Sequence, residues 1–357
     1  MPRLSAISGV GIKGPACFLL EIGGRRLMLD LGRGPDGDRL PDLSAAGRID
    51  AILFSHAHAD HTGGLVLWQA LGRPPLYATR PTIALAPQEA MRDALALEDR
   101  DEILGIPVQT GPAGHAPGAV WMRLGGPGGL VYTGDISGES TLFRHSLPPP
   151  ARALVFDASY ATEPRMLDQQ IDEILAATGP DTLFPCPAGG RGLEMALQFR
   201  ARGLDIALCP LHRQVANLLL AHEGWLVPGG ARALRELLAQ ARPLEAESPP
   251  LGIMIAAGPN AERGVSAALA RRMVDAGRGR IVFTGHVARG TPAEALVASG
   301  RACFMRWNVH PAFAEQREIV ATVAPEIALA AFCDAAALPA LRATTGWPLA
   351  GGTEMAW

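Results

Sequence analysis

ILFSHAHADHTGGL, residues 52–65, is a short apolar run followed by three histidines and an aspartate within six residues. The apolar part, Ala51–Phe54, indicates a buried strand. A helical pattern follows over Leu65–Leu71, so we expect the polar residues to lie on a strand-to-helix loop. Further on, Pro81–Ala96 is rich in alanine and leucine and predicts a helix.

The polar residues of this loop suit a metal site. His56 and His58 are two residues apart, and side chains so spaced on an extended backbone point the same way. Asp60 and His61 follow where the chain turns, so they can face a second, nearby point. Neutral imidazole and carboxylate are ligands for Zn²⁺, Mn²⁺ or Fe. The alternative is a histidine-rich surface loop, but the spacing H-x-H-x-D-H is far more specific than a lone pair of histidines.

Composition narrows the class of protein. The chain has 357 residues, a length typical of about two domains, with 48% hydrophobic and 19% charged residues. No apolar run reaches the roughly 18 residues of a membrane helix, so we expect no membrane partner. Five scattered cysteines without C-x-x-C spacing favour a reducing cytoplasm. The net charge of −3 lacks the basic surplus that is usual for proteins that grip nucleic acid through phosphates.

The order His56-x-His58-x-Asp60-His61 resembles the signature of the metallo-β-lactamase fold. In that family the first two histidines bind one metal, and the Asp-His pair binds the other. The resemblance therefore implies an α/β protein with the four-layer αββα metallo-β-lactamase fold and Zn as cofactor, one or two ions, with Mn or Fe as alternatives.

Three further segments continue the resemblance. GPAGHAPG, residues 111–118, presents His115 on a rigid turn, which implies a third ligand for the first metal. Thr133-Gly134-Asp135 ends a strand, and the resemblance implies that Asp135 bridges both metals and, with Asp60, orients the attacking water. Asp30 closes an earlier apolar run, where the family has an aspartate that supports the metal loop through hydrogen bonds. Taken alone, Asp30 and Asp135 are also compatible with simple turn formation.

Later segments resemble the β-CASP branch of this fold, the RNA- and DNA-processing nucleases. Asp157-Ala158-Ser159-Tyr160 is similar to the branch's acidic motif, which implies a catalytic Asp157. Phe184–Gly192 is placed like its proline- and glycine-bearing strand-to-helix turn, and Ile253–Gly258 like a strand of its cap. Ile281–His286 resembles the return to the core. We therefore expect a discontinuous metal-binding core, residues 1–165 and 281–357, around a β-CASP-like α/β cap, residues 166–280.

The last two histidine motifs of that branch are altered. The closest match to the first puts Phe313 at the histidine position, with His310 three residues earlier. The closest match to the second puts Phe332 where a ligand of the second metal is expected, followed by Cys333 and Asp334. Because a phenyl ring binds no metal, we regard His310, Cys333 and Asp334 as candidate replacement residues.

The resemblance implies a metal-dependent hydrolase, first of all one that cleaves phosphodiester bonds in RNA or other single-stranded nucleic acid. A second interpretation is the same core acting on a small ester, lactone, thioester or phosphate, which the acidic charge balance favours. A third is a non-catalytic relative that binds metal and a partner. The oligomeric state stays open.

Overall fold

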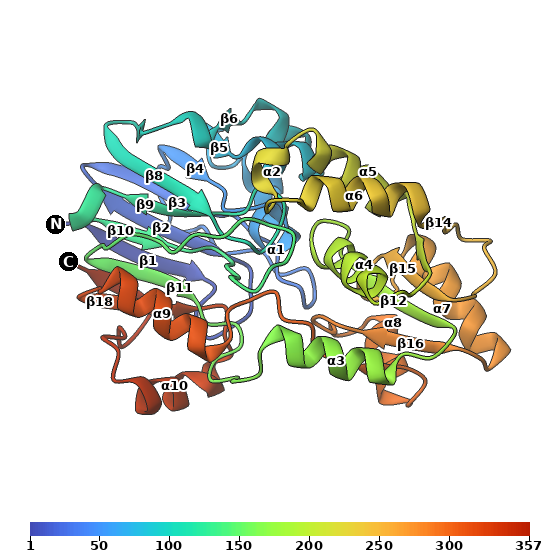
Figure 1. Ribbon diagram of the computed structural model, residues 1–357. Helices are drawn as coiled ribbons and strands as arrows, with labels where there is room; N and C mark the ends of the chain where they lie inside the picture. The colour runs from blue at the N-terminus through green and yellow to red at the C-terminus, as the bar shows by residue number, and fades with distance from the viewer. The chain divides into compact units, whose positions relative to one another are not determined.

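The computed structural model describes all 357 residues, Met1–Trp357, and the chain divides into two units (Figure 1). Unit 1 combines Met1–Pro164 with Val309–Trp357, and unit 2 is the continuous segment Arg165–Asn308 between them. None of the helices combines the length and apolar character that crossing a bilayer requires.

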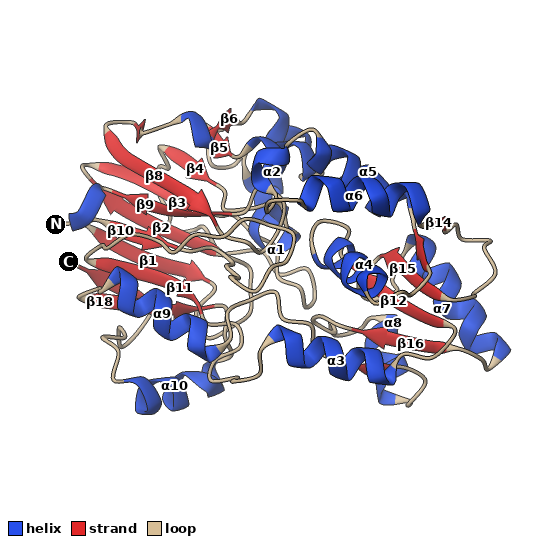
Figure 2. Ribbon diagram, in the orientation of Figure 1, coloured by secondary structure: helices blue, strands red, loops and turns tan.

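The first sheet of unit 1 has seven strands in the order β19-β1-β2-β3-β4-β5-β6 (Figure 2). β2 and β3 form the antiparallel hairpin around Gly23-Gly24, and β3 to β6 run parallel. The metal-binding loop follows β4 at the centre of this parallel part. The bounds are β1 Arg3–Ser8, β2 Cys17–Ile22, β3 Arg25–Leu29, β4 Ala51–Leu53, β5 Leu76–Ala78, β6 Leu95–Ala96 and β19 Glu354–Ala356.

The second sheet of unit 1 has six strands in the order β18-β11-β10-β9-β8-β7. β10 pairs in parallel with β11, and β11 with β18, so the carboxyl ends of these three strands meet at one edge. The bounds are β7 Glu102–Ile103, β8 Ile106–Pro112, β9 Val120–Leu124, β10 Leu130–Tyr132, β11 Ala153–Asp157 and β18 Ile327–Ala331.

The two sheets pack face to face, and helical segments cover their outer faces. Phe18 of β2 contacts Tyr132 of β10, with ring centroids 5.4 Å apart. Trp68 and Leu71 pack on the outer face of the first sheet. The helices α9, Phe313–Val323, and α10, Leu338–Thr345, cover the second through side chains such as Ile319 and Leu341. The predicted α/β class with helix, sheet, sheet and helix layers is confirmed.

The helix expected over Pro81–Ala96 is wrong in extent. α2 spans only Arg80–Leu85, and a 3-10 turn over Glu89–Asp93 then leads into β6. Pro87 disfavours the helical backbone at Ala86, which is extended with ψ 128°. The helical pattern after the metal loop is likewise short, with α1 at Ala59–Thr62 and a 3-10 turn at Gly63–Leu67.

Unit 2 has one fully parallel sheet in the order β14-β13-β15-β12-β16-β17. Five of its six helices lie between these strands in the sequence, and α3 precedes the first of them. Buried residues such as Leu183, Met254 and Leu269 form a core of its own. The strands are β12 Thr182–Cys186, β13 Ile206–Leu208, β14 Arg242–Pro243, β15 Ile253–Ala257, β16 Arg280–Phe283 and β17 Cys303–Phe304. The helices are α3 Leu167–Ala177, α4 Arg191–Ala201, α5 Pro210–Leu220, α6 Gly230–Gln240, α7 Gly264–Ala276 and α8 Pro292–Ala298.

The boundary expected near residue 281 differs from this division. β16 pairs in parallel with β12, through Thr182 with Arg280 and Leu183 with Ile281. Residues 281–308 therefore lie in unit 2, and the chain rejoins unit 1 at Val309. The apolar run Ile281–Phe283 specifies a buried strand, but it does not specify which sheet that strand joins.

Candidate metal centre

The loop after β4 directs its polar side chains in two directions. His56 lies in the extended part of the loop, and His58 is the last extended residue, with φ −65° and ψ 151°. The backbone N–H groups of His61 and Thr62 both donate to the carbonyl of His58, at 3.0 and 2.9 Å. This tight turn starts α1, so Asp60 and His61 project from a helix while the earlier histidines project from the loop.

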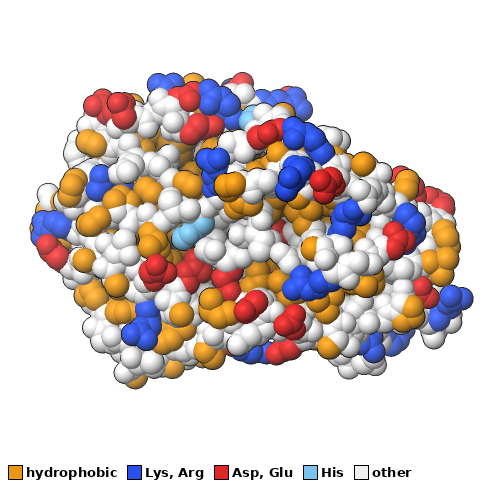
Figure 3. Space-filling view, in the orientation of Figure 1, with side chains coloured by type: hydrophobic (Ala, Val, Ile, Leu, Met, Phe, Trp, Pro, Cys, Tyr) orange, Lys and Arg blue, Asp and Glu red, His pale blue; other side chains and the backbone are white.

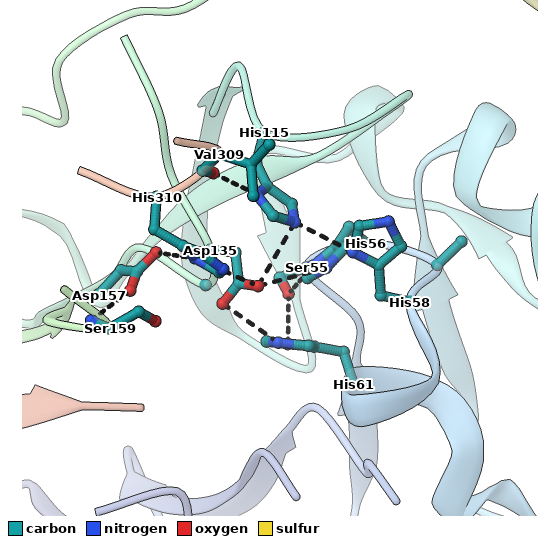
Figure 4. Close-up of polar contacts among 12 residues, drawn as sticks. Ser55, His56, His58, His61, His115, Asp135, Asp157, Ser159, Val309 and His310 are labelled. Carbon is teal, nitrogen blue, oxygen red and sulfur yellow. Dashed lines mark hydrogen bonds and ion pairs between the residues drawn. The ribbon is translucent and has the colours of Figure 1, made fainter. Parts of the chain in front are cut away.

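A first group of side chains that could hold a metal ion consists of His56, His58, His115 and Asp135, whose potential ligand atoms all lie within 4.8 Å of one another. Figure 4 shows these side chains pointing toward one another. His115 Nε2 is 3.0 Å from His58 Nδ1 and 3.4 Å from Asp135 Oδ2. His56 Nε2 is 3.7 Å from the same carboxylate oxygen. Three ring nitrogens and one oxygen thus converge.

These residues fit a divalent cation. His56 Nε2 is fully buried and has no hydrogen-bond partner, a costly arrangement unless a ligand completes it. Burial, together with the neighbouring His61 and His58, holds the pKa of His56 well below its usual value. Burial also holds the pKa of His115 well below its usual value, although Asp135 acts in the opposite direction. Neutral imidazoles are the form that binds metal.

A second group consists of Asp60, His61 and Asp135. His61 Nε2 is 3.2 Å from Asp135 Oδ1, so Asp135 offers one oxygen to each group. Burial lowers the pKa of His61, but Asp135 and Asp30 outweigh this effect and hold that pKa well above its usual value. A nitrogen lone pair cannot face a carboxylate without a proton or a cation between them, so this group also fits a positive ion.

Asp30 supports the second group through hydrogen bonds to His61 and to its neighbours. Its carboxylate accepts hydrogen bonds from the backbone N–H and the hydroxyl of Ser55, both at 2.7 Å, and from the hydroxyl of Tyr132 at 2.5 Å. Its Oδ2 also lies 2.7 Å from His61 Nδ1. With a proton on Nδ1, His61 directs its Nε2 lone pair toward Asp135. Asp30 therefore lies where the sequence analysis expected a supporting carboxylate.

A third group joins Asp135 to Asp157 and His310. His310 Nδ1 is 2.8 Å from Asp157 Oδ2 and 3.7 Å from Asp135 Oδ2. The same segment contacts the first group, because the carbonyl of Val309 lies 2.5 Å from His115 Nδ1. Asp157 in turn accepts from the backbone N–H of Ser159 at 2.9 Å. Of the three candidate replacement residues, the structure brings His310 into the site.

Phe313 does not lie in any of the three groups. Phe313 is the first residue of α9 and packs against Trp347, with ring centroids 6.1 Å apart. His310, three residues earlier, lies on the extended segment before the helix and reaches Asp157. Because α9 begins at Phe313, the histidine that contacts Asp157 precedes the helix rather than starting it.

Phe332 lies beside the second group. It follows β18, is 3% exposed, and its ring centroid is 5.3 Å from that of His61. Cys333 belongs to the hydrophobic core around α9, and burial raises the pKa of its thiol to about 11. Asp334 is exposed. Neither of these two residues is part of the three groups, so the structure does not bring them in as replacements.

Ser55 and Tyr132 are site residues that the sequence analysis missed. Ser55 Oγ lies 3.1 Å from His56 Nδ1 and 3.2 Å from His61 Nδ1, besides its bonds to Asp30. Its position directly before H-x-H was a usable signal, because a hydroxyl there can reach both histidines. Tyr132 precedes Thr133-Gly134-Asp135, but nothing in the sequence relates it to Asp30, which is 102 residues away.

The chain is similar to proteins of the metallo-β-lactamase superfamily, including a ribonuclease. The family model described as Metallo-beta-lactamase superfamily matches residues 10–185. Ribonuclease TTHA0252 of Thermus thermophilus is 29% identical over 332 residues, covering 80% of this chain and 76% of that protein. Transcription termination factor FttA of Cenarchaeum symbiosum is 27% identical, covering 54% of this chain and 38% of the factor. Cleavage and polyadenylation specificity factor 73 of Drosophila melanogaster is 26% identical, covering 56% and 36%.

A solved structure supports the fold. The crystal structure of a protein of unknown function from Enterococcus faecalis V583 superposes with a TM-score of 0.53 and 13% identity. The match covers 93% of this chain and 94% of that one. The chain spans about three quarters of the Thermus protein but less than two fifths of the archaeal factor and the Drosophila factor.

Proposed function

The chain belongs to the metallo-β-lactamase superfamily and is similar to its β-CASP nucleases, and from this premise we propose that it is a metal-dependent hydrolase of phosphodiester bonds in RNA or single-stranded DNA. The observation that carries the proposal is the sharing of Asp135 between two groups of metal-binding side chains, with the His310–Asp157 pair beside them. The ribonuclease named among the relatives supports the substrate class.

A metal bound by these groups would activate water and polarise the scissile phosphate. His56, His58 and His115 would hold the first ion, and Asp60 and His61 the second, with Asp135 shared. Nitrogen and oxygen donors of this kind favour zinc, while Mn or Fe suit the same set. Ser55 and Asp30 keep the imidazoles in the orientation that binding requires.

His310 has a separate role in the proposal. Its Nδ1 donates to Asp157, which fixes the ring and leaves Nε2 for the substrate. A histidine held by a carboxylate in this way can contact a phosphate oxygen or pass a proton to the leaving group. Asp157 thereby acts through His310, and Asp60 and Asp135 orient the attacking water.

A small ester, lactone, thioester or phosphate is the second candidate substrate. Figure 3 shows basic and acidic side chains interspersed over the visible face, without a continuous basic surface. The net charge of −3 and the phenyl ring of Phe332 beside His61 also favour this candidate. A non-catalytic relative is the third. The five free cysteines support the expected cytoplasmic location.

The decisive experiment follows cleavage of fluorescent single-stranded RNA and DNA, and of generic phosphodiester and ester substrates, by metal-loaded protein. We expect cleavage of single strands that chelation removes and added metal restores. His58→Ala should lower the rate about 100-fold or more, since loss of one ligand disturbs the whole group. His222→Ala, which removes a histidine of unit 2, is the matched control. Turnover of the ester alone would select the second candidate, and no turnover the third.

A further inference from the structure

The carboxyl edge of the sheet in unit 2 has the features of a ligand site. Leu183 of β12 packs with Leu269 of α7 and Ala293 of α8, while Phe184 packs on Phe199 of α4 with ring centroids 5.1 Å apart. Successive strand residues point to opposite faces of the sheet. The helix that follows β12, α4, therefore packs on one face, and α7 and α8 pack on the other. Such a change of side opens a crevice at the carboxyl ends of parallel strands.

The first turn of α4 faces this edge. Gly190 precedes the helix with φ 132° and, as a glycine, offers no side chain that could cap the first backbone N–H groups. The helix has 11 residues, so its N-terminus carries the partial positive charge of a full helix. Pro187, Ala188 and Gly189, which lead into it, are half-buried.

The second observation is a buried cation at the same place. Arg191, the first residue of α4, is 7% exposed, and its Nε has no hydrogen-bond partner. Its guanidinium lies directly over Gly285, where a Cβ would come within 2.6 Å of Cζ. Gly285 follows β16, so the arginine crosses the carboxyl edge of the sheet. Only glycine leaves room for it there.

The strand beneath Arg191 supplies a thiol rather than an anion, because Cys186, at the end of β12, is its hydrogen-bonding neighbour. Burial raises the pKa of that thiol to about 11, although Arg191 acts in the opposite direction. The thiol is therefore neutral at physiological pH. The first turn of α4 also holds a buried carboxylate, since Glu194 is 2% exposed. A buried guanidinium with an open donor is costly unless an anion completes it.

We propose that Arg191, whose guanidinium is accommodated over Gly285, forms a phosphate-binding site in unit 2 together with the backbone N–H groups at the start of α4. Helix N-termini and guanidinium groups are both suited to phosphate oxygens. The inference rests on the proposed function for its natural occupant, which is a backbone phosphate of the single-stranded substrate. The site itself requires only a phosphate group.

Phosphate binding is tested on the full, metal-loaded chain by thermal unfolding in sodium phosphate and in sodium chloride of equal ionic strength. We expect phosphate to raise Tm of the wild type, and Arg191→Gln and Gly285→Ala to lose that part of the rise. Arg271→Gln, which removes a surface charge from α7, should keep it. Phosphate bound at the metal centre affects all four proteins alike. An equal rise in Tm for all four, or for none, overturns the site.

The same variants separate a binding role from a structural one. Removing a buried cation whose Nε has no partner and whose neighbouring thiol is neutral should leave Tm in chloride unchanged or higher, because a buried charge without a counter-ion opposes folding. A clear fall in Tm of Arg191→Gln in chloride, or its failure to fold, would mean that the guanidinium is structural, and the proposal would be wrong.

The natural occupant is tested by anisotropy with a labelled oligoadenylate across a salt series, in an Asp135→Asn background that prevents cleavage. Loss of one phosphate contact should reduce the slope of log K against log salt by about 0.7 in both variants. An unchanged slope for an oligonucleotide that the protein with Asp135 intact cleaves contradicts this inference but leaves the nuclease intact. A phosphate effect that depends on Arg191, without any oligonucleotide binding, supports the site and contradicts the nuclease.

Discussion

Asp30 and Phe332 are two residues whose backbone has positive φ, at +58° and +65°, and both lie against His61. Asp accepts this conformation more readily than most residues, because its short side chain can bond locally. A phenylalanine there is unusual and strained. Phe332 is held by its N–H bond to the carbonyl of Gly9 at 2.7 Å and by edge contact with Phe18.

Phe332 leads to a prediction about metal content. The second group has Asp60, His61 and Asp135 but meets a phenyl ring beside His61, so it should bind metal more weakly than the first. Phe332→His should raise tightly held metal from about one to about two ions per chain. Histidine also tolerates positive φ. Elemental analysis after dialysis, with activity measured in parallel, checks this.

Two controls accompany that substitution. Phe332→Leu keeps an apolar side chain and should leave the metal content unchanged. Phe313→His should also leave it unchanged, because Phe313 packs with Trp347 away from the three groups. Wild-type protein that already retains two ions per chain through dialysis would show that Phe332 does not weaken metal binding by the second group.

At the scale of elements, α9 tethers the loop that follows Asp135. Glu315 lies in its first turn, is 8% exposed, and accepts a hydrogen bond from the backbone N–H of Gly138. His145 Nε2 is 3.8 Å away. Burial raises the pKa of Glu315 to about 8, although the bond from Gly138 acts in the opposite direction. This carboxyl group therefore takes up a proton on folding at neutral pH.

The sign of the pH effect follows from this shift. The pKa of Glu315 is higher in the folded state than in the unfolded state. Its contribution to the stability of the folded state is therefore fully present below about pH 4.5 and is lost as pH rises through about 8. Glu315→Gln should remove this slope and stabilise the protein at pH 8 by roughly 1–3 kcal/mol. Urea unfolding of both proteins at pH 5 and pH 8 measures the difference. Equal pH slopes for wild type and variant would contradict the protonation.

At the scale of the whole molecule, the two units differ in how their chain is arranged. Unit 2 is continuous, Arg165–Asn308, and forms its six-stranded sheet and its core from this segment alone. Unit 1 needs both of its segments, because β18 pairs with β11 and α9 supplies Ile319 and Val320 to the core.

We therefore expect residues 165–308, expressed alone, to fold and to unfold cooperatively in urea. Residues 1–164 alone should not fold cooperatively, because the outer face of the second sheet would lose α9 and its edge would lose β18. Circular dichroism across a urea series checks both fragments. A folded 1–164 fragment, or an unfolded 165–308 fragment, would contradict the division.

Local sequence pattern was enough to predict the fold class and the candidate metal-binding residues of the loop after β4. The spacing of His56, His58, Asp60 and His61 is local, and a strand followed by a turn is enough to aim them. His115, Asp135 and Asp157 were expected from the resemblance of their segments to family motifs, and the structure brings all three into the groups around Asp135.

Which later residues complete the candidate site depends on contacts between segments that are distant in the sequence. His310 reaches Asp157 across 153 residues, and Asp30 reaches Tyr132 across 102, through contacts between sheets that local pattern does not encode. The apolar run of β16 suits any buried strand position. Its place in the sheet of unit 2 therefore also depends on contacts between distant segments. Arg191 over Gly285 likewise depends on β12 and β16 being neighbours, because pairing between distant strands is set by the packing of the whole sheet.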